Sequence, residues 1–216
     1  MKAKNYIYLR GGVVSSRTSK SFSSITLATD GNSGNLTSFP TIVSYDNMFE
    51  GIKIGERVTI EAHVQLRPIF GDNRKIVKYE TNFVCDHIEL NKRPLAAYVD
   101  DTEDFDPYDG GTMSDENYAL IFGRINRVYV PHENFTLLSI HVPAIRNQKM
   151  DICEVGCFKR QSGIAQMLEK GDYVMVYGSI RTKNEKDESG NLITKQHVIC
   201  KDILKVKHLD GFSDSN

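Results

Sequence analysis

The sequence predicts an all-β protein that consists of two small five-stranded Greek-key barrels in tandem. Short runs rich in β-branched and aromatic residues recur along the 216-residue chain, separated by clusters of Gly, Asn and Asp, as is typical of strands and turns. An acidic segment without helical or strand periodicity divides the chain nearly in half. Each half contains five such runs in the same order, and a small closed barrel has five strands.

The expected strands follow one another in the same way in the two halves. In the first half they are residues 5–16, 21–30, 39–45, 56–66 and 78–90. In the second half they are residues 117–130, 134–144, 150–158, 172–182 and 195–207. The pattern therefore predicts two copies of one architectural unit.

One short helix is expected after the third strand of each half. In the first half it is a brief turn over residues 47–52, and in the second an amphipathic helix over residues 161–170. In the second segment Ile164, Met167 and Leu168 have the spacing of one apolar helix face, and a glycine follows. A helix between strands three and four is where an OB-fold closes the end of its barrel, although periodicity alone also allows other all-β barrels.

Charge is segregated along the chain, although the net charge is only −1. Residues 1–97 carry 13 Lys and Arg against 9 Asp and Glu, and residues 117–209 carry 14 against 9. Residues 98–116 hold eight acids and no base, so an acidic linker masks two basic modules. We predict domains at 1–97 and 117–209, a linker at 98–116 and a short tail at 210–216. We expect the linker either to keep the protein soluble or to compete with a polyanion for the two basic modules. A metal site is disfavoured because an Asp- and Gly-rich segment lacks a rigid geometry.

The sequence contains no pattern that points to an enzyme, a membrane protein or a cofactor site. No apolar run approaches a membrane span and no signal peptide is visible, so we expect a cytoplasmic protein, or one in the host cytoplasm if it is viral. The six histidines are scattered, and no catalytic triad or phosphate-binding loop occurs. We therefore expect no catalysis, no metal and no cofactor. The cysteines lack paired spacing, which predicts buried free thiols at Cys85, Cys153, Cys157 and Cys200.

A specific motif lies in residues 156–203, GCFKRQSGIAQMLEKGDYVMVYGSIRTKNEKDESGNLITKQHVICKDI. A strand ends in an aromatic residue, a short helix follows, and then come L-x-KG-x-x-V-x-V-x-G-x-I-RT and a hairpin with D-x-SG. This order resembles the core of the bacterial and phage single-stranded-DNA-binding protein family, and the opening strand with Asn117 and Gly123 is similar too. The matching residues are Leu168, Lys170, Gly171, Val174, Val176, Gly178, Ile180, Arg181, Thr182, Asp187, Ser189 and Gly190.

The first half is a more distant copy of the same pattern. NYIYLRGGV, SITLAT and IKIGERVTIEAHVQLR stand in the corresponding places, with Ala62 where the family has Gly and Leu66 where it has Thr. The two copies together resemble the tandem OB-fold members of the family. The resemblance implies a non-enzymatic protein that binds single-stranded DNA without sequence preference and protects it during replication, recombination or repair. It also implies a homodimer, and contacts with replication or recombination proteins.

Binding of single strands needs aromatic faces for the bases and cations for the phosphates. The family's stacking positions, carried over by the match, give Phe158 in the second half, with Ile145, Ile152 and Glu185 at the other three places. In the first half the places hold Ser33, Phe39, Tyr45 and Ile69, with Phe70 beside the last. We therefore expect the first barrel to supply most of the stacking. For Tyr6, Tyr8, Phe83, Phe122, Tyr173 and Tyr177, core or flanking positions are the stronger expectation.

Cations are expected to contact phosphates from both halves, with the second barrel supplying most of these contacts. The favoured contact loop is the first-half hairpin over residues 66–80, where cations surround Phe70. The hairpin over residues 181–195 is either a second contact loop or a solvated turn whose acids cancel its bases. The expected contacts in the first half are Arg10, Arg67, Arg74, Lys75 and Lys78, and those in the second half are Arg124, Arg127, Lys159, Arg160, Arg181, Lys183, Lys186 and Lys195.

Two other functions remain open from the sequence. The aromatic residues missing from the second half favour an OB-fold protein-interaction module of the replication-restart or recombination-mediator type. An RNA-binding OB protein would differ in preferring a strand with 2′-hydroxyls. The chain ends in HLDGFSDSN, which is either a reduced acidic recruiting tail or a frayed end. The short tail and diverged first half would suit a phage-encoded protein.

Overall fold

The computed structural model describes residues 5–30, 37–70, 75–91, 115–143, 150–186, 190 and 192–206. Contacts between residues divide the chain into two compact units. Unit 1 comprises Met1–Asn5, Ala119–Ser179 and His197–Asn216, and unit 2 comprises Tyr6–Tyr118 and Ile180–Gln196. Within the described part of the chain, no helix is long and apolar enough to cross a membrane.

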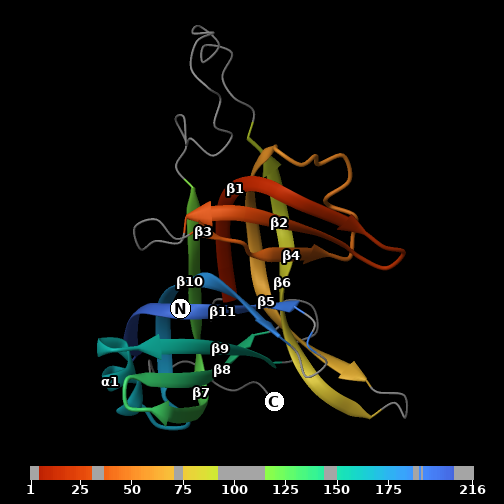
Figure 1. Cartoon of the computed structure of the whole chain (residues 1–216). Coiled ribbons are helices and arrows are strands. Elements are labelled where there is room, and N and C mark those ends of the chain that lie inside the picture. The colour runs from red at the N-terminus through yellow and green to blue at the C-terminus, as the bar shows by residue number, and fades with distance from the viewer. Residues whose placement is uncertain are drawn as a thin grey trace, which may run out of the picture. The chain divides into compact units, whose positions relative to one another are not determined.

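Unit 1 is built on a closed five-stranded barrel. Its strands pair in the order β7-β8-β9-β11-β10, and β10 pairs back to β7 (Figure 1). β7 pairs antiparallel with β8 and β10, β8 pairs antiparallel with β9, and β9 pairs parallel with β11. This Greek-key order is that of an OB-fold, as predicted. The bounds are β7 Glu116–His132, β8 Phe135–Pro143, β9 Met150–Phe158, β10 Tyr173–Lys186 and β11 Leu192–Val206.

Unit 2 repeats the same topology. Its strands pair in the order β1-β5-β6-β4-β2, and β2 pairs back to β1, with β4 and β6 parallel. A short strand, β3, adds to β2 at the edge and is not in the sequence prediction. The bounds are β1 Asn5–Thr18, β2 Ser23–Asp30, β3 Thr37–Ser38, β4 Thr41–Ser44, β5 Arg57–Phe70 and β6 Ile76–Leu90. All ten predicted strands are present, and their ends differ from the prediction by a few residues.

Strict alternation of side chains produces the barrel cores. On β8, Leu138, Ile140 and Val142 are fully buried, and the residues between them are partly exposed. The four cysteines are buried and free, as the sequence predicts. Burial raises the pKa of Cys85 to about 12, so its thiol stays protonated at neutral pH.

The helix of unit 1, α1, is shorter than predicted. It spans Arg160–Gln166, and the chain then continues in turns. Because the helix ends before Met167, that side chain leaves the predicted apolar face and is 71% exposed. The side chains that α1 buries are Ser162 and Ala165.

Unit 2 has turns, and no helix, between its third and fourth barrel strands. Asn47 and Gly51 adopt positive φ angles of 55° and 82°, which a continuous helix does not allow. The peptide N–H groups of Glu50 and Ile52 donate to the carbonyls three residues earlier. Phe49 is only 4% exposed, so these turns supply an apolar side chain to the core.

The contact-defined units differ from the predicted domains at residues 1–5, 117–118 and 180–196, and the last of these segments is the longest. Residues 180–196, which form the β10–β11 hairpin, belong to unit 2. Asn117 contributes to this grouping because its side-chain amide donates to the Ile180 carbonyl and accepts from the Ile180 N–H, each at 2.8 Å. The hairpin is therefore a part of unit 2.

Asp172 joins two elements of unit 1 and provides a pH-dependent test of the fold. Its carboxylate accepts from the Glu169 N–H at 2.9 Å and pairs with Lys205 at 2.7 Å. The hydrogen bond from Lys205 lowers the pKa of the Asp172 carboxyl below its usual value. The stabilisation is therefore present above the usual pKa of about 4 and is lost as the pH falls through the lowered pKa. We expect Asp172→Ala to cost on the order of 1 kcal/mol in urea unfolding at pH 7. The difference from wild type should shrink below about pH 4, whereas a difference independent of pH would contradict this role.

Candidate nucleic-acid interface

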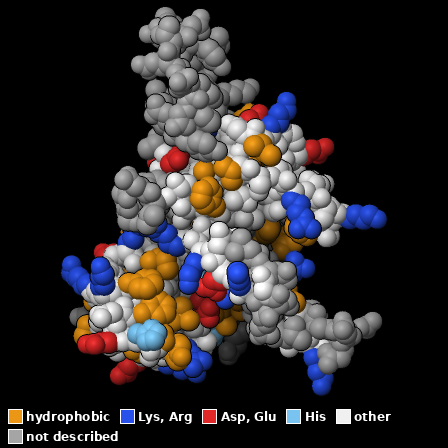
Figure 2. All heavy atoms as spheres, in the orientation of Figure 1, with side chains coloured by type: hydrophobic (Ala, Val, Ile, Leu, Met, Phe, Trp, Pro, Cys, Tyr) orange, Lys and Arg blue, Asp and Glu red, His pale blue; other side chains and the backbone are white. Residues whose placement is uncertain are grey.

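The outer surface of β7, β8 and β9 in unit 1 is defined by strand register. Arg127 lies opposite Ser139, which lies opposite Glu154. One row further along, Tyr129 lies opposite Leu137, which lies opposite Gly156. Leu137 and Ser139 alternate with buried residues of β8, and Arg127, Tyr129 and Glu154 are exposed, so these positions form the outward face of the barrel, with Gly156 covered among them. Figure 2 shows hydrophobic side chains gathered over β8 and β9, with Lys and Arg at their edges.

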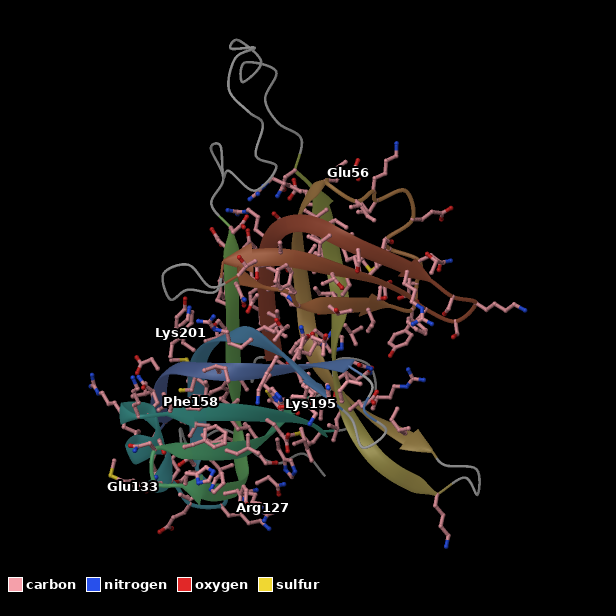
Figure 3. All side chains as sticks on the ribbon, viewed as in Figure 1. Glu56, Arg127, Glu133, Phe158, Lys195 and Lys201 are labelled. Carbon is pink, nitrogen blue, oxygen red and sulfur yellow. The ribbon has the colours of Figure 1, made fainter. Side chains whose placement is uncertain are left out.

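An aromatic pair occupies one end of this face. Phe158, the last residue of β9, is 47% exposed and lies opposite Phe135 on β8. The two ring centroids are 4.6 Å apart and the planes are tilted by 35°. A Cβ on Gly156 would lie 3.2 Å from the Phe135 ring and 3.1 Å from Ile199. The absence of a side chain at Gly156 therefore leaves room for the Phe135 ring and Ile199. Phe158 is therefore an exposed ring that packs against the Phe135 ring (Figure 3).

Two cations follow Phe158 directly in the chain. Lys159 adopts a positive φ of 51°, and its N–H donates to the Asn134 carbonyl at 3.0 Å. This geometry turns the chain sharply from β9 into α1. Lys159 and Arg160 are both exposed, so the turn presents two positive side chains next to the aromatic pair.

Two further exposed rings on unit 1 each have a cation over one face, and the sequence prediction includes neither ring among its stacking residues. The Arg127 guanidinium lies over the Tyr129 ring at 5.2 Å, and Tyr129 is 49% exposed. The Lys201 ammonium lies 5.5 Å from the centre of the Tyr177 ring, which is 44% exposed. The Arg-x-Tyr spacing in one strand could have indicated the first pair, because residues two apart share a face. The second pair comes from two strands and has no local sequence pattern.

Phe39 and Tyr45 of unit 2 also lie outside the core. Phe39 is 45% exposed, and its N–H donates to the Thr182 hydroxyl at 3.0 Å. Tyr45 follows β4 and is 36% exposed. By contrast, Phe83 and Phe122 are buried in the cores, as expected for most strand aromatics. Of the rings that the sequence gives as base-stacking candidates, Phe39, Tyr45 and Phe158 are thus exposed.

Arg10 makes its contacts within unit 2. Its guanidinium donates to Glu116 at 3.0 Å and to the Tyr8 hydroxyl at 2.6 Å, and its side chain is 18% exposed. Asp115 pairs with Arg57 in a similar way. The last two acids of the predicted linker therefore neutralise arginines of this unit. The charge of Arg10 is therefore satisfied within unit 2.

The cations of the two hairpins differ in exposure and in pairing. Lys183 and Lys195 both pair with Glu185, at 3.1 and 2.7 Å, whereas Lys186 is exposed and Arg181 is half-buried. On the β5–β6 hairpin, Arg67 and Lys75 are exposed. The side chains of Phe70, Arg74 and Lys78, together with Ser33 and Ile145, lie outside the described residues.

The remaining predicted positions are placed as follows. Arg124 is exposed, and its Nε donates to the Gly171 carbonyl at 3.3 Å. Ile69 and Ile152, at places where the family stacks bases, are half-buried. Within the described part of the chain, no group of three His, Cys, Asp or Glu residues could hold a metal ion.

Two closed barrels with OB-fold strand order, each with exposed rings on its outer surface, define a tandem OB-fold protein. The fold is similar over its whole length to the single-stranded DNA binding protein from Thermus aquaticus. A deletion mutant of that protein matches with a TM-score of 0.65 and 16% identity, covering 100% of this chain and 99% of the other. The wild-type protein matches with a TM-score of 0.65 and 15% identity, covering 99% and 98%. No protein-family model and no curated protein sequence matches this chain.

Proposed function

We propose that this protein binds single-stranded DNA without sequence preference and without catalysing a reaction. The observation that carries the proposal is Phe158, an exposed ring supported by Phe135 and followed by Lys159 and Arg160. Base stacking on exposed rings and neutralisation of phosphates are the two interactions that such binding needs. The similarity in fold to the Thermus aquaticus single-stranded DNA binding protein supports the same function here.

We propose a binding surface on each of the two units. On unit 1 it runs over Phe158, Lys159, Arg160 and the Arg127–Tyr129 pair, with Arg124 and the Lys201–Tyr177 pair on the same barrel. On unit 2 it comprises Phe39 and Tyr45 together with Arg67 and Lys75. Arg10 is left out because Glu116 already satisfies its charge.

The biological role that we propose is protection and organisation of DNA single strands during replication, recombination or repair. The modules would be the predicted domains at 1–97 and 117–209, joined by the acidic segment. By the family resemblance, the protein would act as a homodimer in the cytoplasm of a cell or of a phage host. Its protein partners would be replication or recombination enzymes.

Titration with oligo-dT at several salt concentrations tests the proposal. The chain has ten Tyr and no Trp, and Tyr45, Tyr129 and Tyr177 are exposed, so tyrosine emission should be quenched on binding. The affinity should fall linearly on a log–log plot against salt. Arg127→Ala should reduce the slope by about 1, because one phosphate contact is lost.

A matched control separates this contact from a general effect of charge. Lys53, exposed in the turns before β5, lies outside the proposed surface, so Lys53→Ala should leave the slope unchanged. The absence of quenching even at low salt would refute DNA binding. Tighter binding of a matched RNA oligomer would show instead that the strand bound is RNA.

A further inference from the structure

A groove of about 490 Å³ opens on the surface of unit 2. One wall comes from the β2–β4 side of the barrel, and the other comes from the β10–β11 hairpin. None of its lining residues is charged, and Phe39 is its one ring. The lining residues are Thr26, Thr37, Phe39, Thr41, Thr182, Asn184 and Thr194.

Hydrogen bonds hold the two walls in place. The Gln196 side-chain amide accepts from the Thr41 N–H at 3.0 Å and donates to the Thr41 carbonyl at 3.1 Å, as a paired strand would. The Ser38 hydroxyl donates to the Ile180 carbonyl at 3.0 Å. The Phe39 N–H donates to Thr182 beside them. The groove is therefore preformed, and a ligand need not order it on binding.

Two of the lysines that flank the groove in sequence share one carboxylate. Lys183 and Lys195 both bind the Glu185 carboxylate. Hydrogen bonds from Lys195 and then Lys183 lower the pKa of this carboxyl, so the pairs persist at neutral pH. The two lysines and Glu185 together keep one positive charge beside the groove, whereas the residues that line the groove offer only uncharged dipoles to a ligand.

The polar groups that remain suit the edge of a flat, neutral ring. The Thr194 hydroxyl donates to the Asn184 side-chain oxygen at 2.8 Å, which leaves the Thr194 oxygen free to accept and the Asn184 amide nitrogen to donate. Because the Thr182 oxygen accepts from Phe39, its own proton can be donated elsewhere. The Phe39 ring supplies a stacking face beside these groups.

We infer that this groove binds one nucleobase of the single strand, stacked on Phe39 with its edge hydrogen-bonded to Asn184, Thr194 and Thr182. This inference rests on the proposed function and assigns the β10–β11 hairpin to base contact, where the sequence allowed phosphate contact. Neutral hydrogen bonds release no counterions, so this part of the affinity does not depend on salt. The contribution from cations on unit 1 does depend on salt.

The test uses the full-length protein with Asn184→Ala and Thr194→Val. Each variant should bind short oligo-dT about fivefold more weakly, because one hydrogen bond contributes about 1 kcal/mol. The fold-change should be the same at low and high salt. On an abasic oligomer of equal length, both variants should bind as wild type does, because no base edge is present. Thr18→Val, at an exposed threonine of the same unit outside the groove, is the matched control and should bind as wild type.

Three results would overturn the inference while leaving DNA binding intact. The first is wild-type affinity in both variants. The second is a loss that persists on the abasic oligomer, and the third is a reduced salt slope, which would indicate phosphate contact. If wild-type protein does not bind oligo-dT at low salt, the proposed function fails, and the groove assignment fails with it.

Discussion

Replacing Gly123 with alanine is expected to destabilise unit 1 by about 3 kcal/mol or more, enough to unfold much of the protein at moderate urea concentrations. Gly123 lies on β7 where this strand packs tightly against β8. An added Cβ would lie 2.1 Å from the His141 carbonyl oxygen and 2.8 Å from a methyl carbon of Ile140. Neither neighbour can move easily, since one is backbone and the other is fully buried. Urea unfolding followed by circular dichroism measures the loss.

Gly163→Ala is the matched control for this substitution. Gly163 lies in α1 and a Cβ there would meet nothing within 4 Å, so alanine should stabilise the helix by up to about 1 kcal/mol. Gly11→Ala should behave like Gly123→Ala, because its Cβ would lie 2.1 Å from the Ala28 carbonyl oxygen at the same place in the other barrel. A Gly123→Ala protein within about 0.5 kcal/mol of wild type would show that the strands separate more easily than the structure implies.

Replacing Phe158 with alanine should weaken oligo-dT binding by about tenfold, the largest single effect on the proposed function. Stacking of one base contributes about 1–3 kcal/mol, and tenfold corresponds to about 1.4 kcal/mol. Phe158 is 47% exposed on the Phe135 ring, so its removal takes away a stacking face and little of the core. Phe158→Tyr should retain the affinity because it keeps the ring. Fluorescence titration at one fixed salt concentration measures both variants.

Two comparisons make the Phe158 result specific. Met167→Ala removes an apolar side chain that is 71% exposed at the end of α1, and it should leave the affinity unchanged. The double variant Phe39→Ala/Tyr45→Ala tests whether the first barrel supplies most of the stacking. If Phe158→Ala costs more affinity than the double variant, that expectation is wrong. An unchanged affinity in Phe158→Ala would remove the main support for the proposed function.

The strands could be predicted from local sequence, but the extent of the helix could not. Alternating apolar residues and turn-forming clusters determine each strand, and both are visible within a few residues. The helix prediction extended to Lys170 because Ile164, Met167 and Leu168 have helical spacing. The helix ends at Gln166, and Leu168 becomes buried from a turn. Periodicity alone cannot distinguish those two arrangements.

The candidate site was predicted only in part, for reasons of geometry. Phe158 could be found because a motif places it at the end of a strand, and the structure leaves it on the surface. Lys201 and Tyr177 lie on two different strands, so no local sequence pattern predicts their contact. Arg10 was expected to contact phosphate, but its charge is satisfied by Glu116, which lies 106 residues away in the chain. Such a pairing depends on the fold and not on local sequence.

The sequence by itself determined the two-barrel architecture, the ten barrel strands and the stretches that are rich in rings and cations. These properties depend on periods of two residues and on turn chemistry, which act over short distances along the chain. Only the tertiary structure decided which rings remain exposed, which cations are already paired and that residues 180–196 form one wall of the unit 2 groove. Those outcomes depend on contacts between residues far apart in sequence, because each strand acquires an inner and an outer face only when the barrel closes.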